Sequence, residues 1–495
     1  MMPNDKPETP SASVPATLGG ARVWAADVDR GDPGLLAPSI TIRARLDLPS
    51  RCRNNPGTAE TASHRTSAPA ASRHRAPVPV ASPPMTIVHP IGRAWITTGG
   101  TGAQNYDEFA DEAEITAIIA DNPHSALAVE MPHRSPAAAG RPYAACLDDA
   151  VARLEQTKKA GGYRPQAETI VLYRISWPVS RNAGADMAAA YGLYCMVDTD
   201  QISTSAEEPG RVIRNEDVFV EKVRERVALA DATNHLLSPV LLLAAGTPGA
   251  RLHEALAAAC DGAGAPAAVD VDQAGRTHAI WPLPPGRDAD RLRELASAGD
   301  LVVADGNHRS LAAQVGGQPR FLAVITTPDS VTIQPYHRLV GPLPISPTEL
   351  VNRLAAAGAE VTDLPGRPQT PPHGGAVHLY AAGRGWAVRL AAPRGADALE
   401  RLDHALVESQ ILAGPLGLDA GDKRVTYVGG DYPAQWLCDE VDAGRADLAV
   451  LIAPVTVDDF LAVNLARRKL PRKSTWFTPK ARAGLVLAEL TGHTA

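Results

Sequence analysis

After Met85, short apolar runs of strand length alternate with segments of helical spacing, and this alternation constrains the fold most strongly. Two runs rich in β-branched and aromatic residues, 169–176 and 191–197, predict two strands that pair as a hairpin. Further strands are predicted over 240–243, 278–281, 301–304, 377–380, 387–390 and 448–453. Helices are predicted over 144–159, 221–235, 252–259, 290–298, 347–357, 399–412 and 457–466. The pattern predicts an α/β fold of mixed α+β type with two lobes.

Composition changes near Met85, and this change predicts the domain organisation. Residues 1–84 hold 13 of the 43 prolines and carry ten basic against seven acidic side chains, in a chain whose net charge is −7. They show neither helical nor strand periodicity and no apolar signal-peptide core, so we expect a disordered leader or an over-long gene start. An N-terminal catalytic region is predicted over 85–345, and a C-terminal α/β lobe over 346–495.

Charge, hydropathy and cysteine content argue against several classes of protein. The acidic balance disfavours a dedicated nucleic-acid binder, and no apolar run reaches the roughly 20 residues of a membrane span. The five cysteines are scattered, without the paired spacing of a zinc site or a disulfide framework. These features predict a soluble cytoplasmic protein, with no membrane partner and with nucleic acid an unlikely one.

The most informative local segment is LVVADGNHR, residues 301–309. A buried strand is predicted to end at Asp305, turn at Gly306 and enter a helix whose first turn carries His308 and Arg309. Amides at a helix N-terminus favour an anion, and an arginine can bind phosphate oxygens in a bidentate manner. The residue types alone leave open a simple Asp-Gly turn with a capping role.

Two other segments carry groups suited to binding phosphate or substrate. Arg-Asn-Glu at 214–216 precedes a predicted helix with Lys222 and Arg226, and KSTWFTPK at 473–480 interleaves lysines and hydroxyls with aromatics. An ordinary solvated helix start and a solvated terminal strand are the alternatives. His337, in the run Tyr-His-Arg, is interpreted as a structural histidine.

In this order the segments resemble one family, the bacterial and archaeal "domain of unknown function 1015" family. That family is distantly similar to the ParB/sulfiredoxin-like fold and its free serine kinases. Its R-H-E block is matched by RNE at 214–216, its F-I-A-D-G-H-H-R by LVVADGNHR, and its P-x-H-R by PYHR at 335–338. Its closing P-x-K-S-T-Y-F-Y-P-K is matched by PRKSTWFTPK at 471–480. The resemblance spans residues 85–490, and an N-terminal P-Y-D is matched only by 105–107.

The resemblance implies a ParB/sulfiredoxin-like nucleotide-binding core that phosphorylates a small hydroxyl-bearing amino acid, foremost free L-serine to O-phospho-L-serine. It implies Glu216 as the base, with Asp305 and His308 as further catalytic residues, and ATP or ADP with Mg²⁺ as cofactors. The carboxylate of the substrate is expected to bind Arg214 or Arg226. Nucleotide and phosphate are expected to bind Gly306, Asn307, Arg309, Lys473, Ser474, Thr475 and Lys480.

Two residues depart from the family pattern. Asn215 and Asn307 stand where the family usually has histidine. These departures keep open a second function, that of a ParB-like nucleotide-binding regulatory or adaptor protein without metabolite kinase activity.

Overall fold

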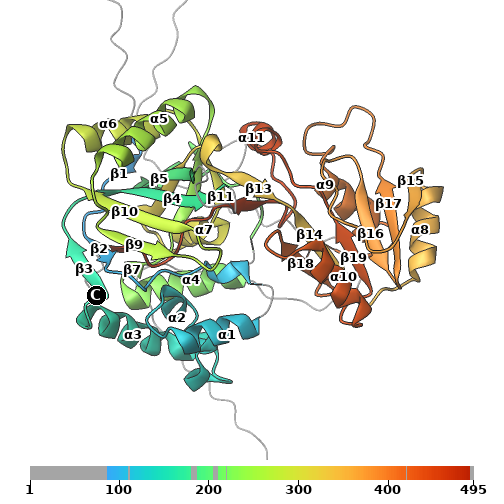
Figure 1. The fold of residues 1–495 in the computed structure, drawn as a ribbon, viewed down its shortest axis with the longest axis horizontal. Coiled ribbons are helices and arrows are strands. Elements are labelled where there is room, and N and C mark those ends of the chain that lie inside the picture. The colour runs from blue at the N-terminus through green and yellow to red at the C-terminus, as the bar shows by residue number, and fades with distance from the viewer. Residues whose placement is uncertain are drawn as a thin grey trace, which may run out of the picture. The chain divides into compact units, whose positions relative to one another are not determined.

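A nine-stranded sheet forms the largest layer of the computed structural model, which describes residues 86–109, 112–179, 187–203, 210–218, 220–419 and 421–490. The strand order is β6-β11-β8-β12-β5-β4-β10-β9, with β1 paired to β5. Figure 1 labels β1, β4, β5, β9, β10 and β11 of this sheet. The strands are β1 Val88–His89, β4 Ile170–Pro178, β5 Met187–Asp198, β6 Val212–Ile213, β8 Val240–Ala244, β9 Ala268–Val271, β10 Thr277–Leu283, β11 Leu301–Asp305 and β12 Arg320–Thr326. The predicted hairpin is confirmed, because β4 and β5 pair in antiparallel register.

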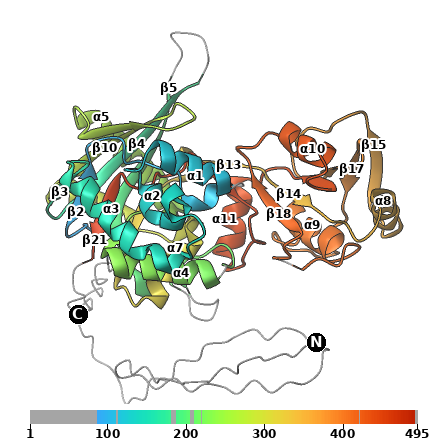
Figure 2. The same cartoon turned by 90° about the horizontal axis from the view of Figure 1, so that it is seen from below.

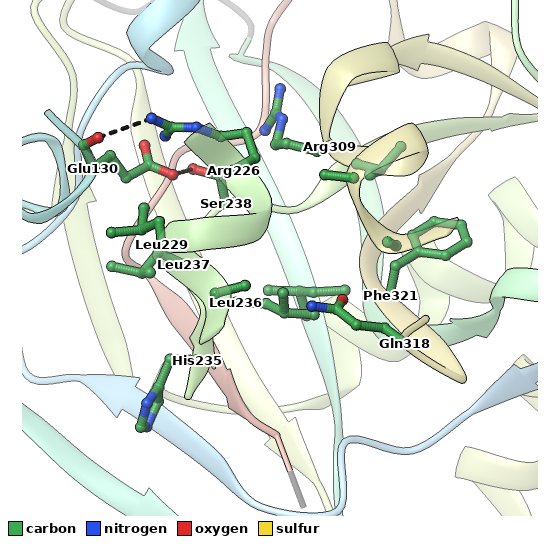
Figure 3. Close-up of a pocket in the computed structure, with 15 residues that line it drawn as sticks. Glu130, Arg226, Leu229, His235, Leu236, Leu237, Ser238, Arg309, Gln318 and Phe321 are labelled. Atoms are coloured by element: carbon green, nitrogen blue, oxygen red, sulfur yellow. Dashed lines mark hydrogen bonds between the residues drawn. The ribbon is translucent and has the colours of Figure 1, made fainter. Parts of the chain in front are cut away.

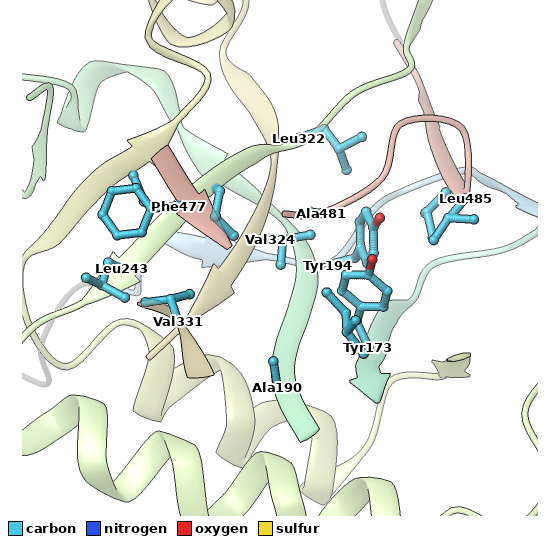
Figure 4. Packing of buried hydrophobic residues seen from close by; sticks show 14 of the residues in the cluster. Tyr173, Ala190, Tyr194, Leu243, Leu322, Val324, Val331, Phe477, Ala481 and Leu485 are labelled. Atoms are coloured by element: carbon cyan, nitrogen blue, oxygen red, sulfur yellow. The ribbon is translucent and has the colours of Figure 1, made fainter. Parts of the chain in front are cut away.

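Helices cover this sheet on both faces. One apolar core contains side chains of α5 (Gly246–Gly262) and α6 (Arg287–Ala296), including Leu252, Leu256 and Leu292. The other core contains Tyr173 and Tyr194 from the sheet, together with Phe477 and Leu485 from near the C-terminus (Figure 4). The second core also contains Phe460 and Val463 of α11 (Val457–Leu465), whereas α7 (Asn307–Val315), which contacts α4 (Val220–Thr233), adds Ala313 to the first core.

A four-stranded sheet of order β3-β2-β21-β7 lies beside helices from the first half of the chain. Its strands are β2 Ala94–Thr97, β3 Tyr163–Gln166, β7 His235–Leu236 and β21 Val486–Glu489. The helices are α1 Glu112–Asp121, α2 Ala126–Glu130 and α3 Leu147–Lys159, and α3 contacts both α2 and α4 (Figure 2). The last strand of the chain is therefore an inner strand of a sheet formed largely by residues before 240.

A six-stranded sheet of order β15-β17-β16-β19-β14-β18 makes up the second lobe. Its strands are β14 Tyr336–Val340, β15 Glu360–Leu364, β16 Val377–Ala381, β17 Arg384–Arg389, β18 Val425–Gly429 and β19 Leu448–Leu451. Two apolar cores lie on it, one with α8 (Pro347–Ala356) and α9 (Asp403–Val407), the other with α10 (Ala434–Asp442). The predicted helix over 399–412 is observed as α9 followed by a π-helical turn at Glu408–Leu412.

Strand pairing groups residues differently from the predicted lobe boundaries. The six-stranded sheet begins at Tyr336, ahead of the predicted boundary at 346. After α11 (Val457–Leu465), β20 (Trp476–Thr478) pairs with β13 (Thr332–Gln334), and β21 pairs with β2 and β7. The KSTWFTPK segment thus pairs with a strand outside the six-stranded sheet: Phe477 enters the core of the larger sheet, while Trp476 packs edge-on against Tyr336 of β14.

The observed elements confirm the predicted mixed α/β class. The described residues fall within one unit, 80–495, and the predicted leader over 1–84 and the start at Met85 lie outside them. Among the described helices, none has the length and apolarity needed to cross a membrane. The cysteines at 146, 195, 260 and 438 are buried free thiols.

Candidate active site

Two parallel strands bring the predicted base and the predicted phosphate turn to one edge of the large sheet. In β6 and β11, Val212 pairs with Leu301 and Ile213 with Val302. The residues that follow each strand therefore leave the sheet at the same edge. Glu216 comes three residues after β6, and Asp305 is the last residue of β11.

The turn after β11 depends on Gly306. This residue caps α7 with φ of +96°, in the left-handed region that glycine adopts readily. A Cβ placed there would lie 3.1 Å from Arg309 Nε and 3.2 Å from the Cα of Val240. The sequence prediction of a strand, a glycine turn and a helix is confirmed at this point, and Asn307, His308 and Arg309 in the first helical turn are all buried.

Arg309 is directed into the protein. Its Nη2 donates to Asp305 Oδ2 at 2.5 Å, and its Nη1 donates to Asn105 Oδ1 at 2.9 Å and to the Pro239 carbonyl at 2.6 Å. The predicted contact of this guanidinium with phosphate stays a prediction. In this structure Arg309 orients the Asp305 carboxylate and closes the turn.

Lys480 supplies the cation that faces the turn. Its ammonium lies 3.5 Å from Asp305 Oδ1 and 3.8 Å from Glu108 Oε1, and it stands 3.7 Å from the centroid of the Trp476 ring. Asn105 links Glu108 to Arg309. Its Nδ2 donates to Glu108 Oε1 at 2.7 Å, and its Oδ1 accepts from Arg309. An anion reaching this edge would meet Lys480 between two carboxylates.

Lys473 approaches Glu216 through its backbone. Its N–H donates to Glu216 Oε2 at 2.8 Å, and its ammonium stands 5.7 Å from the centroid of the Tyr336 ring. Burial raises the pKa of the Tyr336 phenol, with Glu216 adding to this effect while Lys473 and Lys480 oppose it. Glu216 and both lysines are thus within electrostatic range of one buried ring.

The remaining residues of the 471–480 segment have local roles. Ser474 is buried, and its hydroxyl donates to the Pro471 carbonyl at 2.7 Å. Thr475 is half-buried beside it. The predicted phosphate contacts of these two hydroxyls stay predictions, and Ser474 is already engaged within its own segment.

The two arginines predicted to hold a substrate carboxylate are Arg226 and Arg214, and Arg226 lines the same small cavity as Arg309. Arg226 is buried, donates to the Glu130 carbonyl at 3.0 Å and to Tyr143 Oη at 2.9 Å, and lies 4.2 Å from the centroid of the Tyr106 ring (Figure 3). It lines a cavity of about 50 Å³, which is room for a water or two and not for an amino acid. Its observed role is to tie α4 to α2. Burial lowers the pKa of the half-buried Arg214, which follows β6.

A larger cavity, of about 420 Å³, opens next to Glu108. Its charged lining is mostly carboxylate, and its one guanidinium, that of Arg276, is paired with Asp272 at 2.6 Å. Such a lining favours a positively charged or hydrogen-bond-donating ligand group over a phosphate. The lining residues with polar side chains are Gln104, Glu108, Glu114, Asp272, Gln273, Arg276, Asp431 and Tyr432.

Sequence reasoning missed Asn105, Glu108 and Trp476 as members of the cluster. The match of residues 105–107 to the family's P-Y-D was the available signal, because it marks the turn that carries both Asn105 and Glu108. For a metal, the described residues contain no group of three or more His, Cys, Asp or Glu side chains arranged to hold an ion.

A family model described as "Protein of unknown function (DUF1015)" matches residues 101–405, more than half of the chain. The chain belongs to this family. The match includes the RNE block, the Asp305 turn and the Tyr-His-Arg run, so the family resemblance drawn from these motifs is confirmed. No curated protein matches the DUF1015 chain.

Several solved structures are similar to this DUF1015 protein at low identity. A free serine kinase in complex with AMP is 13% identical with a TM-score of 0.32, over 58% of this chain and 87% of its own. A conserved hypothetical protein from Pyrococcus furiosus is 14% identical with a TM-score of 0.33, over 59% and 95%. SbnI with C-terminal truncation, from Staphylococcus aureus, is 12% identical with a TM-score of 0.32, over 59% and 87%.

Proposed function

We propose that this DUF1015 protein is a nucleotide-dependent kinase of a small hydroxyl-bearing amino acid, with free L-serine as the first candidate and O-phospho-L-serine as product. The observation that carries the proposal is the meeting of Glu216 and the Asp305 turn at one edge of the sheet, with Lys480 3.5 Å from Asp305. A base, an acid-terminated glycine turn and a cation are the groups that phosphoryl transfer to an alcohol needs.

In the proposed reaction the substrate hydroxyl oxygen attacks the terminal phosphorus of ATP or ADP. An oxygen–phosphorus bond forms, the bond to the leaving phosphate breaks, and the hydroxyl proton passes to the Glu216 carboxylate. The Lys473 N–H, 2.8 Å from Glu216 Oε2, orients this carboxylate. Positioning in line is the largest requirement, because the transition state involves little covalent chemistry by the protein.

Lys480 and Lys473 are the cations proposed to stabilise the transferred phosphoryl group. Binding would draw the Lys480 ammonium from Asp305 and Glu108 toward the phosphate oxygens. His308, buried in the first turn of α7, and the amides of that turn are proposed as further hydrogen-bond donors to phosphate. Mg²⁺ would supply charge neutralisation when bound to the nucleotide, and Asp305 is the carboxylate proposed to hold it.

The cavity next to Glu108 is proposed to admit the amino acid. At about 420 Å³ it has room for a molecule of this size, and its carboxylates favour the ammonium group of an amino acid. Arg214 stays the proposed partner of the substrate carboxylate, because Arg226 is engaged in the interior.

The proposal is tested with purified full-length chain, Mg²⁺, ATP or ADP, and a panel of hydroxy amino acids, with phosphorylated products detected by mass. An O-phospho amino acid is the expected product. Nucleotide binding with no phosphorylation of any amino acid would reject the kinase and favour the alternative, a nucleotide-binding regulatory or adaptor protein.

Glu216→Gln tests the base directly. The amide keeps the shape of the side chain and removes the proton acceptor, so turnover is expected to fall by roughly 10²–10⁴-fold while nucleotide still binds. Asp217→Asn is the matched control, because Asp217 is the next residue and pairs on the surface with Lys469 at 2.7 Å. Equal activity of Glu216→Gln and wild type would reject Glu216 as the base and leave the kinase itself intact.

A further inference from the structure

The Tyr-His-Arg run of β14 has no role in the reaction proposed above, although it contains the most deeply buried arginine of the second lobe. Arg338 is fully buried, and its Nη2 and Nε donate to Glu408 Oε1 at 3.1 and 3.3 Å. The same guanidinium donates to the carbonyls of Lys473 at 3.0 Å and Arg472 at 3.3 Å. Arg338 therefore joins the six-stranded sheet to the 471–480 segment.

Glu408, the carboxylate partner, lies at an irregularity of the backbone. It begins the π-helical turn Glu408–Leu412 that follows α9, and its carbonyl accepts from the Ala413 N–H at 2.8 Å. Turns of this kind occur often at functional sites, because the extra residue redirects a side chain. Here that side chain is Glu408, which forms the ion pair with the fully buried Arg338.

Lys473 is held in an unfavourable backbone conformation at the far end of these contacts. Its φ of +55° lies in the left-handed region, which costs free energy for a residue with a Cβ. Such strain persists only where surrounding contacts enforce it, and it is concentrated at functional sites. Two contacts flank this peptide: the N–H donates to Glu216 at 2.8 Å and the carbonyl accepts from Arg338 at 3.0 Å.

We propose that Arg338 and Glu408 are positioning residues that hold the Lys473 backbone in its left-handed conformation and so aim its N–H at Glu216. The second lobe would then act on the reaction through one backbone hydrogen bond. The assignment of Glu216 as base rests on the proposed function; the backbone contact does not.

Hydrogen–deuterium exchange of the full chain tests the backbone contact without any activity measurement. Arg338→Lys keeps the charge and loses the planar fork, and Glu408→Gln keeps the shape and loses the charge. In both we expect the Lys473 amide to exchange at least about tenfold faster, with β8 amides unchanged. Arg353→Lys is the matched control, because Arg353 forms a surface pair with Glu349 in the same lobe.

The pH profile of kcat/KM tests the effect on Glu216. The Lys473 N–H favours the ionised carboxylate, so losing it is expected to move the acid limb to higher pH in both variants. A merely structural role would lower activity at every pH without moving that limb.

Unchanged exchange of the Lys473 amide in folded Arg338→Lys and Glu408→Gln would overturn the inference, whatever the activity. Faster exchange with an unmoved acid limb would overturn the link to Glu216. If the wild type phosphorylates nothing, the proposed function fails, and the exchange measurement still decides whether these residues hold Lys473.

Discussion

Arg309 and Arg338 are both buried arginines with a carboxylate partner, one in the large-sheet region and one in the second lobe, yet their ion pairs differ in sequence separation. Arg309 pairs with Asp305, four residues earlier in the same turn. Arg338 pairs with Glu408, 70 residues later, and binds carbonyls at 472 and 473, more than 130 residues later. The ion pair of Arg309 is local, although the same guanidinium also donates to Asn105 and to the Pro239 carbonyl. The ion pair of Arg338 joins segments that only the tertiary structure brings together.

This difference decides what each arginine contributes. A carboxylate within one turn of the arginine is presented to it by the local backbone, and the ion pair mainly fixes the geometry of the turn. Distant partners must be ordered by packing, and removal of the arginine leaves several buried acceptors without a donor. We therefore expect changes at Arg338 to affect stability and changes at Arg309 to affect ligand binding.

Arg338→Ala is expected to have the largest effect. It leaves the Glu408 carboxylate and four backbone carbonyls without their shared donor, and removing one member of a buried pair typically costs about 3–5 kcal/mol. The free energy of unfolding, measured by urea denaturation, should fall by this amount. Arg353→Ala, on the surface of the same lobe, should change it by less than about 0.5 kcal/mol. Equal losses in the two variants would contradict the conclusion that Arg338 joins the six-stranded sheet to the 471–480 segment.

The second largest expected effect is a loss of stability of the second lobe in mild acid. Burial and Arg338 lower the pKa of His337 to about 3, and the same two causes hold the pKa of His404 well below its usual value. Between pH 6.5 and 4 the unfolded chain binds protons that the folded lobe does not, so stability falls as the pH falls. The loss is at most about 1.4 kcal/mol per pH unit for each histidine.

The large-sheet region offers a contrast to this acid sensitivity. Burial also lowers the pKa of His278, but Asp272, 3.1 Å away, offsets part of the lowering. Amides of the second lobe should therefore lose exchange protection before those around β10 as the pH falls from 7 to 5. His337→Asn should flatten the pH dependence of the melting temperature, and an unchanged slope would contradict this cause.

Arg309→Ala tests the other half of the comparison, the expectation that Arg309 affects ligand binding. Loss of this guanidinium frees the Asp305 carboxylate and loosens the turn that is proposed to bind phosphate. Nucleotide affinity, measured by calorimetry on the full chain, is expected to weaken by roughly 1.5–3 kcal/mol, the range for hydrogen bonds to charged groups. Arg353→Ala, on the surface of the second lobe, should leave this affinity unchanged. Unaltered nucleotide affinity in Arg309→Ala would mean that the Asp305 turn has only a structural role.

Gly306→Ala should have the smallest effect of the four. A left-handed alanine costs about 1–2 kcal/mol, and here its Cβ would also lie 3.2 Å from the Cα of Val240. Gly317→Ala is the matched control, because Gly317 has φ of +65° and a methyl group added there would meet nothing within 4 Å. Denaturation should show a larger loss for Gly306→Ala. Equal losses would mean that the close approach at the Asp305 turn relaxes without cost.

Much of the fold follows from periodicity. The β4–β5 hairpin, β8, β11 and α7 were predicted close to their observed bounds, because buried strands and amphipathic helices impose local patterns. The helix over 399–412 was predicted as continuous, and the π-helical turn in its second half went unpredicted. Its cause is tertiary, since the turn directs Glu408 to an arginine 70 residues earlier.

The candidate site was predicted only in part, for the same physical reason. Asp305, Gly306, Glu216, Lys473 and Lys480 were predicted from motif and chemistry, because each lies in a segment with a clear local signature. Glu108 was missed, because a single acidic residue in a short turn has no periodicity to mark it. Arg226 was assigned to the substrate, and the structure places it in the interior, stacked on Tyr106.

The sequence by itself determined the alternating α/β elements, the glycine turn at Gly306 and the kinds of charge that can gather around it. These are local properties, fixed by side-chain spacing and by the conformations that each residue can adopt. Only the tertiary structure decided that Lys480 faces Asp305, that Arg226 is buried, and that Arg338 in the second lobe holds the peptide that contacts Glu216. Those pairings join residues that are tens to hundreds of positions apart. Burial of the apolar side chains around them, and not any local pattern, brings them together.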